Sequence, residues 1–453
     1  MDTIVAVATP PGRSAIGIVR LSGPESLPIV RALVSVEGYD PQPAKVVLKS
    51  IHTPANGLTI DQALLSYFET PNSYTGEDVV EISCHGSPVI LRQLVDATLS
   101  LGARLASPGE FTLRALSNGK INLSQAEAIR DLIEAQTDAA AQQAIRQLSG
   151  ELSSRLQPIK DELLNLIVQL ESAVEFVEDD LPALQRQSIS TGLEGIVCEV
   201  QKLADTFRTG HLLRDGLSVA IVGRPNVGKS TVFNSLLRFE RAIVTSLAGT
   251  TRDTLSERLS ISGIPVVLTD TAGLRADTEN VVESLGLERT RQAMADADLL
   301  LVVMDGATEI TDEDRELLES DGGIPKVITF NKADLDSFSV DRLGPENVET
   351  RVISVSAKTG TGIEDLRLAI VAPFQGGRIN TDGLLITDAR HFDLLCRASG
   401  ELTSSGKLLG TGASEELVLA GLHNALRLLG SITGETTAED VLSQIFATFC
   451  IGK

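Results

Sequence analysis

The stretch Gly223-Arg-Pro-Asn-Val-Gly-Lys-Ser230 determines the fold of the central part of this chain. It follows the apolar run 219–222 and precedes the helical run 231–237, which is the strand–loop–helix context of a phosphate-binding loop. The glycines allow backbone N–H groups to face phosphates. Lys229 is expected to bridge the β- and γ-oxygens, and the Ser230 hydroxyl is expected to ligate Mg²⁺.

Further apolar runs follow at the spacing of parallel strands buried on both faces, at residues 266–268, 299–304, 327–330 and 352–355. They predict a doubly wound α/β domain over residues 215–378. Apolar stripes at helical spacing flank it and predict a helical domain in two segments, residues 120–214 and 379–453. Such an insertion is tolerated because the termini of a domain often lie close together. Residues 1–119 mix short β-rich runs with turn clusters and indicate a compact α+β domain.

The first helical segment has its own start signal. Ser124-Gln-Ala-Glu127 has the spacing of a capping box, and Ala126, Ile129 and Ile133 follow at helical spacing. Two longer apolar stripes come next and predict packed helices. The first contains Leu156, Ile159, Leu163, Leu166, Leu170 and Val174; the second contains Ile189, Leu193, Ile196, Val200 and Leu203.

Three more strings define the expected nucleotide. Asp270-Thr-Ala-Gly273 ends a predicted strand, so its carboxylate is expected near the metal's water shell and the Gly273 N–H near the γ-phosphate. In Asn331-Lys-Ala-Asp334 the last carboxylate can accept hydrogen bonds from guanine N1–H and the exocyclic amine, a donor pair that adenine lacks. Ser356-Ala-Lys358 supplies a backbone N–H for guanine O6. In this order the strings resemble the guanine-nucleotide site of the translation-factor-like GTPases, which predicts GTP as the substrate.

The residues expected to bind GTP come from these strings and from the loop between the phosphate-binding loop and Asp270. They are Asn226, Val227, Gly228, Lys229, Ser230, Thr231, Thr245, Ser246, Leu247, Ala248, Gly249, Thr250, Thr251, Asp270, Thr271, Ala272, Gly273, Asn331, Lys332, Ala333, Asp334, Ser356, Ala357 and Lys358.

Leu274 stands where many small GTPases have a glutamine that orients the attacking water. Charge compensation must then come from another group. Arg252 and Arg275 are candidates, and so is a K⁺ ion held by Asn226 and by oxygen atoms of the loop 245–250. Spacing does not choose among the acids that follow and could orient water, namely Asp277, Glu279, Glu283 and Glu288.

The formal net charge of −22 argues against a broad electropositive surface for nucleic acid. An RNA partner would need a local basic patch or a second, basic subunit. The chain starts Met1-Asp-Thr-Ile without a basic or long apolar leader, and its apolar runs fall short of the roughly 18 residues of a membrane span. The four cysteines form no Cys-x-x-Cys pair. These features predict a cytoplasmic protein with no membrane association; the cysteines are Cys84, Cys198, Cys396 and Cys450.

Outside the central domain, several strings are more specific than the phosphate-binding loop. They are Asp2-Thr-Ile, Ala8-Thr-Pro-Pro-Gly12, Gly17-Ile-Val-Arg20, Tyr74-Thr-Gly-Glu-Asp78, Pro108-Gly-Glu-Phe-Thr112, Asn118-Gly-Lys120, Gln125-Ala-Glu-Ala128 and Phe449-Cys-Ile-Gly-Lys453. With them, essentially the whole chain resembles the tRNA modification GTPases called MnmE or TrmE. One departure is Arg13-Ser-Ala15, where relatives often have more glycine.

The resemblance implies an N-terminal folate-binding and dimerisation domain, a helical domain in two segments and an inserted GTPase domain. It implies a homodimer whose GTPase domains meet in a K⁺-dependent way to hydrolyse GTP. It also implies a flavoprotein partner of the MnmG/GidA type, in a heterotetramer or larger complex. Together they would install an aminomethyl-type group on C5 of the tRNA wobble uridine, with the one-carbon unit taken from a formyl or methylene tetrahydrofolate.

The resemblance also implies roles for individual residues. The K⁺ ligands would be Asn226, Thr245, Leu247 (through its carbonyl) and Thr250. The Mg²⁺ ligands would be Ser230 and Thr251. The water-orienting acid would be Glu283, in Glu283-Ser-Leu-Gly-Leu-Glu-Arg289, with Glu279 as a competitor. The folate contacts would be Arg20, Glu81, Lys120 and Lys453.

Two interpretations stay open at this point. Cys450 is expected to be a small buried hydrophobe, and its place near the folate-contacting C-terminus gives it an alternative chemical role. The GTPase strings alone also fit a switch for ribosome or RNA-particle assembly. That alternative would favour an appended basic RNA-binding module, which the acidic and helical flanks do not suggest.

Overall fold

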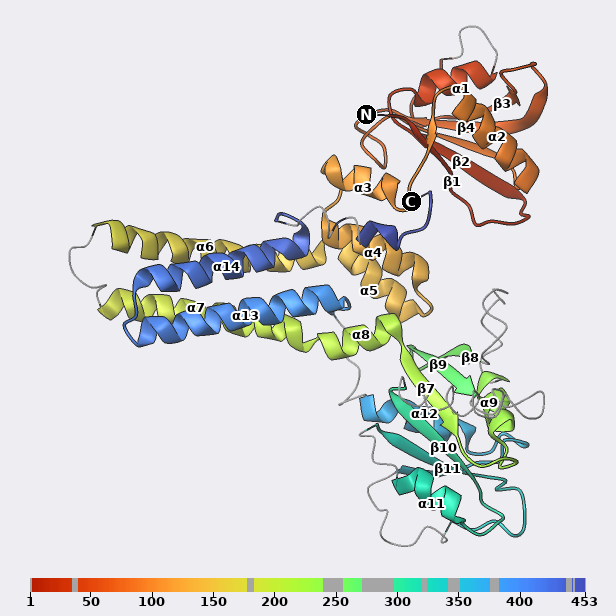
Figure 1. Ribbon diagram of the computed structural model, residues 1–453, viewed down its shortest axis with the longest axis vertical. Helices are drawn as coiled ribbons and strands as arrows, with labels where there is room; N and C mark the ends of the chain where they lie inside the picture. Colours follow the sequence, from red (N-terminus) through yellow and green to blue (C-terminus); the bar gives the residue numbers. More distant parts are fainter. Residues whose placement is uncertain are drawn as a thin grey trace, which may run out of the picture. The chain divides into compact units, whose positions relative to one another are not determined.

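The computed structural model describes residues 2–34, 40–176, 183–238, 256–270, 297–319, 324–340, 351–374, 383–436, 442 and 445–452. The chain divides into two compact units. Figure 1 labels the helices and strands that belong to them. The first comprises Met1–Ile133, Gln147–Leu181 and Thr411–Lys453, and the second comprises Glu134–Arg146 and Pro182–Gly410. The domain boundaries expected from the sequence stay predictions. Among the described residues, no helix is both long enough and apolar enough to cross a membrane.

The N-terminal part of the first unit is a sheet in the order β3-β4-β5-β2-β1-β6. Its strands are β1 (Ile4–Val7), β2 (Ile16–Ser22), β3 (Val46–His52), β4 (Thr59–Phe68), β5 (Val79–His85) and β6 (Arg104–Leu105). Side chains of a strand alternate between faces. One face, with Leu21 and Ile82, packs on α1 (Ser26–Val34) and α2 (Pro88–Ser100).

The other face of this sheet is covered only in part. Over β1, Ile4 and Ala6 pack against Phe111 of α3 (Glu110–Ser117). Over β3 and β4, the cross-strand partners Leu48 and Leu64 are 62% and 45% exposed. One face of the sheet is therefore covered. The opposite face is covered over β1 and is open and apolar over β3 and β4.

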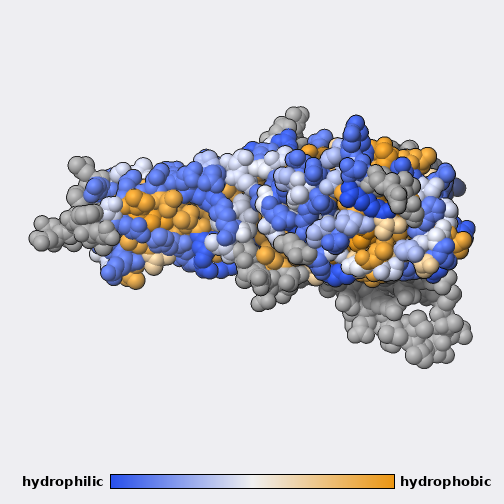
Figure 2. All heavy atoms as spheres, turned by 90° about the horizontal axis from the view of Figure 1, so that it is seen from above, coloured by the Kyte–Doolittle hydropathy of each residue, from blue (hydrophilic) through white to orange (hydrophobic). Residues whose placement is uncertain are grey.

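Four helices complete the first unit: α4 (Leu123–Glu134), the end of α5 (Asp138–Leu148), α6 (Glu151–Phe176) and α14 (Glu415–Thr433). The helix α6 packs along α14, and Glu171 lies 3.1 Å from His423 across the pair. The predicted stripe of α6 is buried from Leu156 to Leu170. Exposed apolar side chains also occur here, among them Val168, and Figure 2 shows at its left an apolar patch framed by hydrophilic side chains.

The predicted start of α4 is wrong by two residues. Asn122 Oδ1 accepts a hydrogen bond from the Gln125 N–H at 2.9 Å, and Gln125 Oε1 accepts one from the Asn122 N–H at 3.0 Å. The capping box is therefore Asn122-Leu-Ser-Gln125, because an asparagine can cap as well as a serine. Ile133 is also 48% exposed, since α4 buries only its first turns.

The second unit contains the helices α7 (Ala183–Asp205), α8 (Phe207–Asp215) and α13 (Ala389–Gly410). The stripe predicted over residues 189–203 is buried, and α7 packs along α13.

The central domain of this unit is a sheet in the order β12-β11-β10-β7-β9-β8. The strands are β7 (Leu217–Val222), β8 (Ser256–Ile261), β9 (Ile264–Asp270), β10 (Leu299–Asp305), β11 (Lys326–Asn331) and β12 (Arg351–Ser354). Among these described strands, only β8 runs antiparallel to its neighbour. The helices are α9 (Lys229–Arg238), α11 (Asp312–Glu319) and α12 (Ile363–Val371), followed by the short turn η4 (Ala372–Phe374).

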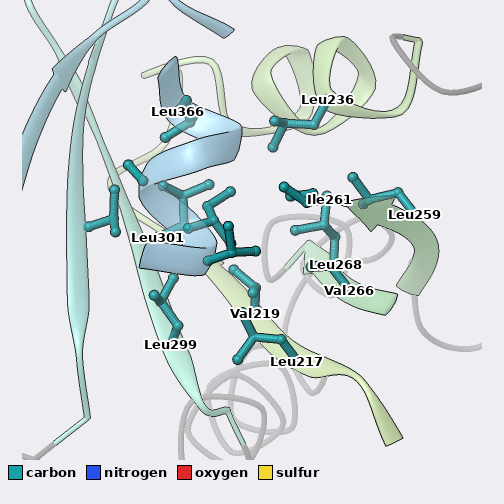
Figure 3. Packing of buried hydrophobic residues seen from close by; sticks show 14 of the residues in the cluster. Leu217, Val219, Leu236, Leu259, Ile261, Val266, Leu268, Leu299, Leu301 and Leu366 are labelled. Carbon is teal, nitrogen blue, oxygen red and sulfur yellow. The ribbon is translucent and has the colours of Figure 1, made fainter. Parts of the chain in front are cut away.

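The predicted strands are confirmed, and four of them are buried. The prediction of burial on both faces is wrong for the run 352–355, because β12 lies at the edge of the sheet and Val352 and Ile353 are only half-buried. Figure 3 shows Val219 of β7, Leu268 of β9 and Leu301 of β10 packed with Leu366 of α12 and Leu236 of α9. The strand β7 lies between β9 and β10, so the chain leaves it toward one edge and later returns on its other side. Ligands of open α/β sheets bind beyond the carboxyl ends of the strands at such a switch point. That is where the phosphate-binding loop lies, and the expected fold class, with its doubly wound P-loop domain, is confirmed.

The segment 383–388 connects the central domain to the helices of the second unit. We call this segment, together with its contacts to α5 and α8, the joint. The segment 383–388 returns the chain to α13, and Gln143 of α5 binds it twice, through the Gly383 carbonyl at 3.0 Å and the Leu385 N–H at 3.1 Å. The Arg214 guanidinium of α8 lies 2.7 Å from Asp388. These contacts clamp the segment 383–388 to α5 and α8.

Candidate functional site

The phosphate-binding loop joins β7 to α9 and is held closely at both ends. Gly223 has φ +149°, and a Cβ there would lie 2.2 Å from the Val303 carbonyl oxygen; Gly228 has φ +96°. Only glycine fits a backbone of this kind without strain. Lys229 Nζ donates hydrogen bonds to the Gly223 carbonyl at 2.8 Å and to the Arg224 carbonyl at 2.7 Å. The ammonium is therefore held against the loop that is expected to bind phosphates.

The two residues expected near the metal lie side by side. Ser230 Oγ, in the first turn of α9, donates a hydrogen bond of 2.8 Å to Asp270 Oδ2 at the end of β9. The Asp270 side chain is buried, so the hydroxyl is oriented by a carboxylate shielded from bulk water. A hydroxyl and a carboxylate are the hard oxygen donors that Mg²⁺ prefers. The donor set therefore fits Mg²⁺.

At the base-binding end, Asn331 connects three of the predicted strings. Its Nδ2 donates to the Val227 carbonyl at 3.0 Å, and its Oδ1 accepts from the Ala357 N–H at 3.1 Å. Asn331 is buried. Segments more than a hundred residues apart in the chain are thereby joined at one edge of the sheet, as the parallel strands predict.

The Asp334 carboxylate, which is expected to bind guanine, is hydrogen-bonded to a nearby serine. Ser356 Oγ donates a hydrogen bond of 2.7 Å to Asp334 Oδ1, and this bond lowers the pKa of Asp334 below its ordinary value. Asp334 is exposed and ionised at neutral pH. Beside it, Lys332 Nζ lies 2.6 Å from Asp305 Oδ2 at the end of β10. The contact of Asp305 with Lys332 was not predicted from the sequence. Asp305 could have been found, because, like Asp270, it is an acid at the end of a buried apolar run.

Part of the predicted nucleotide site lies outside the described residues and stays a prediction. These residues are Thr245, Ser246, Leu247, Ala248, Gly249, Thr250, Thr251, Thr271, Ala272, Gly273, Glu279 and Glu283, together with Leu274 and the alternative candidates Arg252, Arg275, Asp277 and Glu288. Lys453 also lies outside them.

In the N-terminal domain, Arg20 and Glu81 are cross-strand partners on β2 and β5. Arg20 Nε donates to Glu81 Oε1 at 2.9 Å, and Nη1 donates to the Gly452 carbonyl at 3.2 Å. The guanidinium carbon also lies 5.8 Å from the ring centroids of both Tyr74 and Phe111. The structure therefore brings two of the predicted folate residues together with the backbone of the C-terminal tail.

The third predicted folate residue is held by a neighbouring loop. Lys120 Nζ donates a hydrogen bond of 2.9 Å to the Pro71 carbonyl, and Asn118 Nδ2 donates one of 2.7 Å to the Thr75 carbonyl. The loop that contains these carbonyls also contains Tyr74, whose ring contacts Arg20. Residues 71–75 thus connect the surroundings of Lys120 and Arg20.

The expectation that Cys450 is buried is wrong. The thiol residue is exposed, while Phe446 and Phe449 fill the apolar cluster formed with Leu123 and Ala126. The two aromatic rings take the buried positions, and the next residue faces solvent. The Cys450 carbonyl accepts a hydrogen bond from the Gly109 N–H at 3.4 Å.

Comparisons with known proteins extend over the whole chain. The family model described as the MnmE helical domain matches residues 123–450, and the model described as the GTP-binding protein TrmE N-terminus matches residues 3–120. Proteins named tRNA modification GTPase MnmE from Koribacter versatilis, Enterococcus faecalis and Aquifex aeolicus are 43%, 41% and 41% identical to it. Each alignment covers 100% of this chain and 99%, 98% and 100% of the respective relative. The resemblance read from the sequence is confirmed, and the chain belongs to the MnmE (TrmE) family of GTPases.

Proposed function

We propose that this protein hydrolyses GTP in the modification of tRNA. The observation that supports GTP as the substrate is the position of Asn331. Its two hydrogen bonds join the phosphate-binding loop to the strings expected to bind guanine. The full-length match to proteins named tRNA modification GTPase supports the tRNA part. The protein would act in the cytoplasm, together with its tRNA substrate.

The chemical change that we propose for tRNA is the one that the family resemblance implies. The protein would act with an MnmG/GidA-type flavoprotein, in a heterotetramer or larger complex, to install an aminomethyl-type group on C5 of the wobble uridine. The net charge of −22 supports a division of labour in which the partner supplies much of the basic surface that tRNA requires.

Within the GTPase site, each described residue has one task in the proposed mechanism. Lys229 binds the β- and γ-phosphates, Ser230 and Asp270 orient Mg²⁺, and Asp334 holds the guanine edge. Bound Mg²⁺ and K⁺ would supply the positive charge that stabilises the transferring phosphoryl group. Asn226, with φ +66° in the middle of the loop, is the described member of the proposed K⁺ ligands; the others are Thr245, Leu247 and Thr250.

Water orientation is assigned to Glu283 and the completion of the Mg²⁺ shell to Thr251, both on the family pattern. Replacement of Glu283 by Ala should slow hydrolysis with little change in GTP affinity. Normal turnover in that variant would move the role to Glu279. For the cation, equal turnover in Na⁺ and in K⁺ would contradict the assignment to Asn226.

The N-terminal domain is proposed to bind a formyl or methylene tetrahydrofolate. Glu81 can accept two N–H bonds from a pterin, and Arg20, Lys120 and Lys453 can pair with the ligand's carboxylates. Arg20 and Glu81 also form an ion pair with each other, with Nη2 and Oε1 2.7 Å apart. The exposed Cys450 lies in the C-terminal tail, two residues before Gly452, whose carbonyl accepts a hydrogen bond from Arg20. It is a candidate for a chemical role.

A homodimer through the N-terminal domains is supported by the open face of the sheet. Leu48 and Leu64 form an exposed apolar cross-strand pair there. The adjoining strands β5 and β2 carry Glu81 and Arg20, with Ser66 and Glu81 as partners across β4 and β5. A second copy on this face would lie next to the proposed folate residues.

Nucleoside analysis of tRNA tests the proposed function most directly. A strain without this protein should lose the wobble-uridine modification, the wild-type chain should restore it, and the variant Lys229→Ala should not. Unchanged modification in the deletion strain would contradict the proposal. An accompanying defect in ribosomal particles on a sucrose gradient would then favour the assembly switch.

A further inference from the structure

Arg224, the second residue of the phosphate-binding loop, has its side chain anchored away from the loop. Its Nε donates a hydrogen bond of 2.9 Å to Asp314 Oδ1, and the Asp314 side chain is 2% exposed. A hydrogen-bonded pair between a guanidinium and a buried carboxylate is among the stronger polar contacts in proteins. The loop is therefore connected to a residue 90 positions further along the chain.

Asp314 is itself held rigidly by the start of α11. Its second oxygen, Oδ2, accepts hydrogen bonds from the Thr311 N–H at 3.0 Å and from the Thr311 hydroxyl at 3.1 Å. This is the reciprocal contact of a capping box, with Thr311 before the helix and Asp314 in its first turn. Leu317 of the same helix packs on the cluster that contains Val222, the last residue of β7. Arg224 thus binds an element that is fixed to the sheet directly below the loop.

The backbone of Arg224 connects this anchor to the nucleotide site. Its carbonyl accepts a hydrogen bond of 2.7 Å from Lys229 Nζ. Two residues later, Asn226 adopts φ +66°, a left-handed conformation that a non-glycine residue needs support to keep. The ends of the loop are fixed at Gly223 and Gly228, and the Arg224 side chain adds an anchor between them.

We propose that Arg224 and Asp314 are positioning residues, which together form a tether that sets the first half of the phosphate-binding loop for GTP. Through the Arg224 backbone the tether places Lys229, and through the following residues it places Asn226. It deepens the proposed function, and its K⁺ part rests on the cation site proposed above. Because the tether acts on binding geometry, its loss raises the concentration of GTP required rather than slowing the chemical step.

Steady-state GTP hydrolysis and the affinity for a fluorescent GDP analogue test this tether. The variants are Arg224→Met, which keeps the apolar stem, Asp314→Asn, and the double variant Arg224→Met/Asp314→Asn. Each should raise the GTP KM about 10-fold and leave kcat within about 2-fold of wild type. The K⁺ concentration for half-maximal activity should rise in parallel. The matched control is Arg315→Met, which removes an exposed guanidinium 3.3 Å from Asp312 on the same helix and should leave the KM unchanged.

The double variant separates positioning from folding. Each single variant leaves one charge at the site without its partner, which destabilises a protein, whereas the double variant leaves none. If the double variant regains wild-type KM, the effect came from the unpaired charge and the tether is overturned. An unchanged KM in all three variants, or a fall in kcat with KM constant, also overturns it. If wild-type turnover is equal in Na⁺ and K⁺, the cation proposal fails, and the KM for GTP still decides the tether.

Discussion

Asp334 is ionised at neutral pH and is oriented by the Ser356 hydroxyl. Its Oδ1 accepts the Ser356 hydroxyl at 2.7 Å, which lowers its pKa, and the rest of the carboxylate faces solvent. The replacement Asp334→Asn should raise the KM for GTP at least about 100-fold, because hydrogen bonds to charged groups contribute about 1.5–3 kcal/mol each. The amide should instead donate to the C2 carbonyl of xanthine, so that the variant prefers XTP.

The measurement is hydrolysis of GTP and XTP by both proteins. Asp336→Asn is the control, since Asp336 is also exposed and lies two residues away in the same loop. A variant at Asp334 that keeps the wild-type preference for GTP would remove this residue from the base-binding site.

At the residue scale, the sequence predicts a contact best where the chemistry demands one side-chain type at a fixed place on a strand end. Asp270 and Asn331 are of this kind, and they lie where the motif predicts. Asp314 was not predicted, because its partner Arg224 is distant in the sequence and only the packing of α11 brings them together. The exposure of Cys450 likewise depends on which neighbouring rings fill the cluster.

Among the elements, the joint around Asp388 allows a prediction with a defined pH dependence. Burial would raise the pKa of Asp388, but His391, Arg214 and the Arg390 N–H outweigh it and lower the pKa from 3.8 to about 2. A carboxyl group with a lowered pKa in the folded state stabilises the protein above its unfolded pKa. This contribution is lost as the pH falls through about 2.

The replacement Asp388→Asn should therefore lower the free energy of unfolding of the second unit by about 2 kcal/mol at pH 7. The difference from wild type should persist down to about pH 4 and shrink below it. Thermal unfolding followed over this range provides the measurement. Asp393→Asn is the control, because Asp393 and Arg397 form an exposed pair on the same helix, and its effect should stay below about 0.5 kcal/mol. Equal losses in the two variants would argue against a stabilising role for the joint.

In the central domain, the sequence predicts which runs form strands. It does not predict which side chains attach this domain to the helices of the second unit. Continuous apolar runs such as residues 299–304 become buried strands because both faces of a parallel sheet are covered. The clamp on residues 383–388 involves Gln143, whose neighbour Gln142 is an exposed glutamine in the same helix. Nothing in the local sequence distinguishes the two glutamines, since only the folded arrangement gives one of them a backbone to bind.

For the whole molecule, the open face of the N-terminal sheet predicts the assembly state. Monomeric proteins rarely leave large contiguous apolar patches exposed, and here Leu48 and Leu64 form an exposed apolar pair across β3 and β4 in a single chain. We expect the homodimer proposed above to bury this pair. The replacement Leu64→Asp should weaken dimerisation at least about 10-fold, because a carboxylate buried without a partner costs more than the 1.4 kcal/mol that this factor represents.

Sedimentation equilibrium over a range of protein concentrations measures this change. Val89→Asp is the matched control, since Val89 is 52% exposed on α2, and α2 packs against the opposite face of the sheet. Both residues are exposed in the single chain, so neither replacement should unfold the domain, and far-UV circular dichroism checks this. A monomeric wild-type chain would contradict the homodimer itself, whereas a Leu64→Asp variant as dimeric as Val89→Asp would place the interface elsewhere. If the dimer does use this face, folate binding should weaken together with dimerisation, because the sheet face that carries Arg20 and Glu81 continues directly into it.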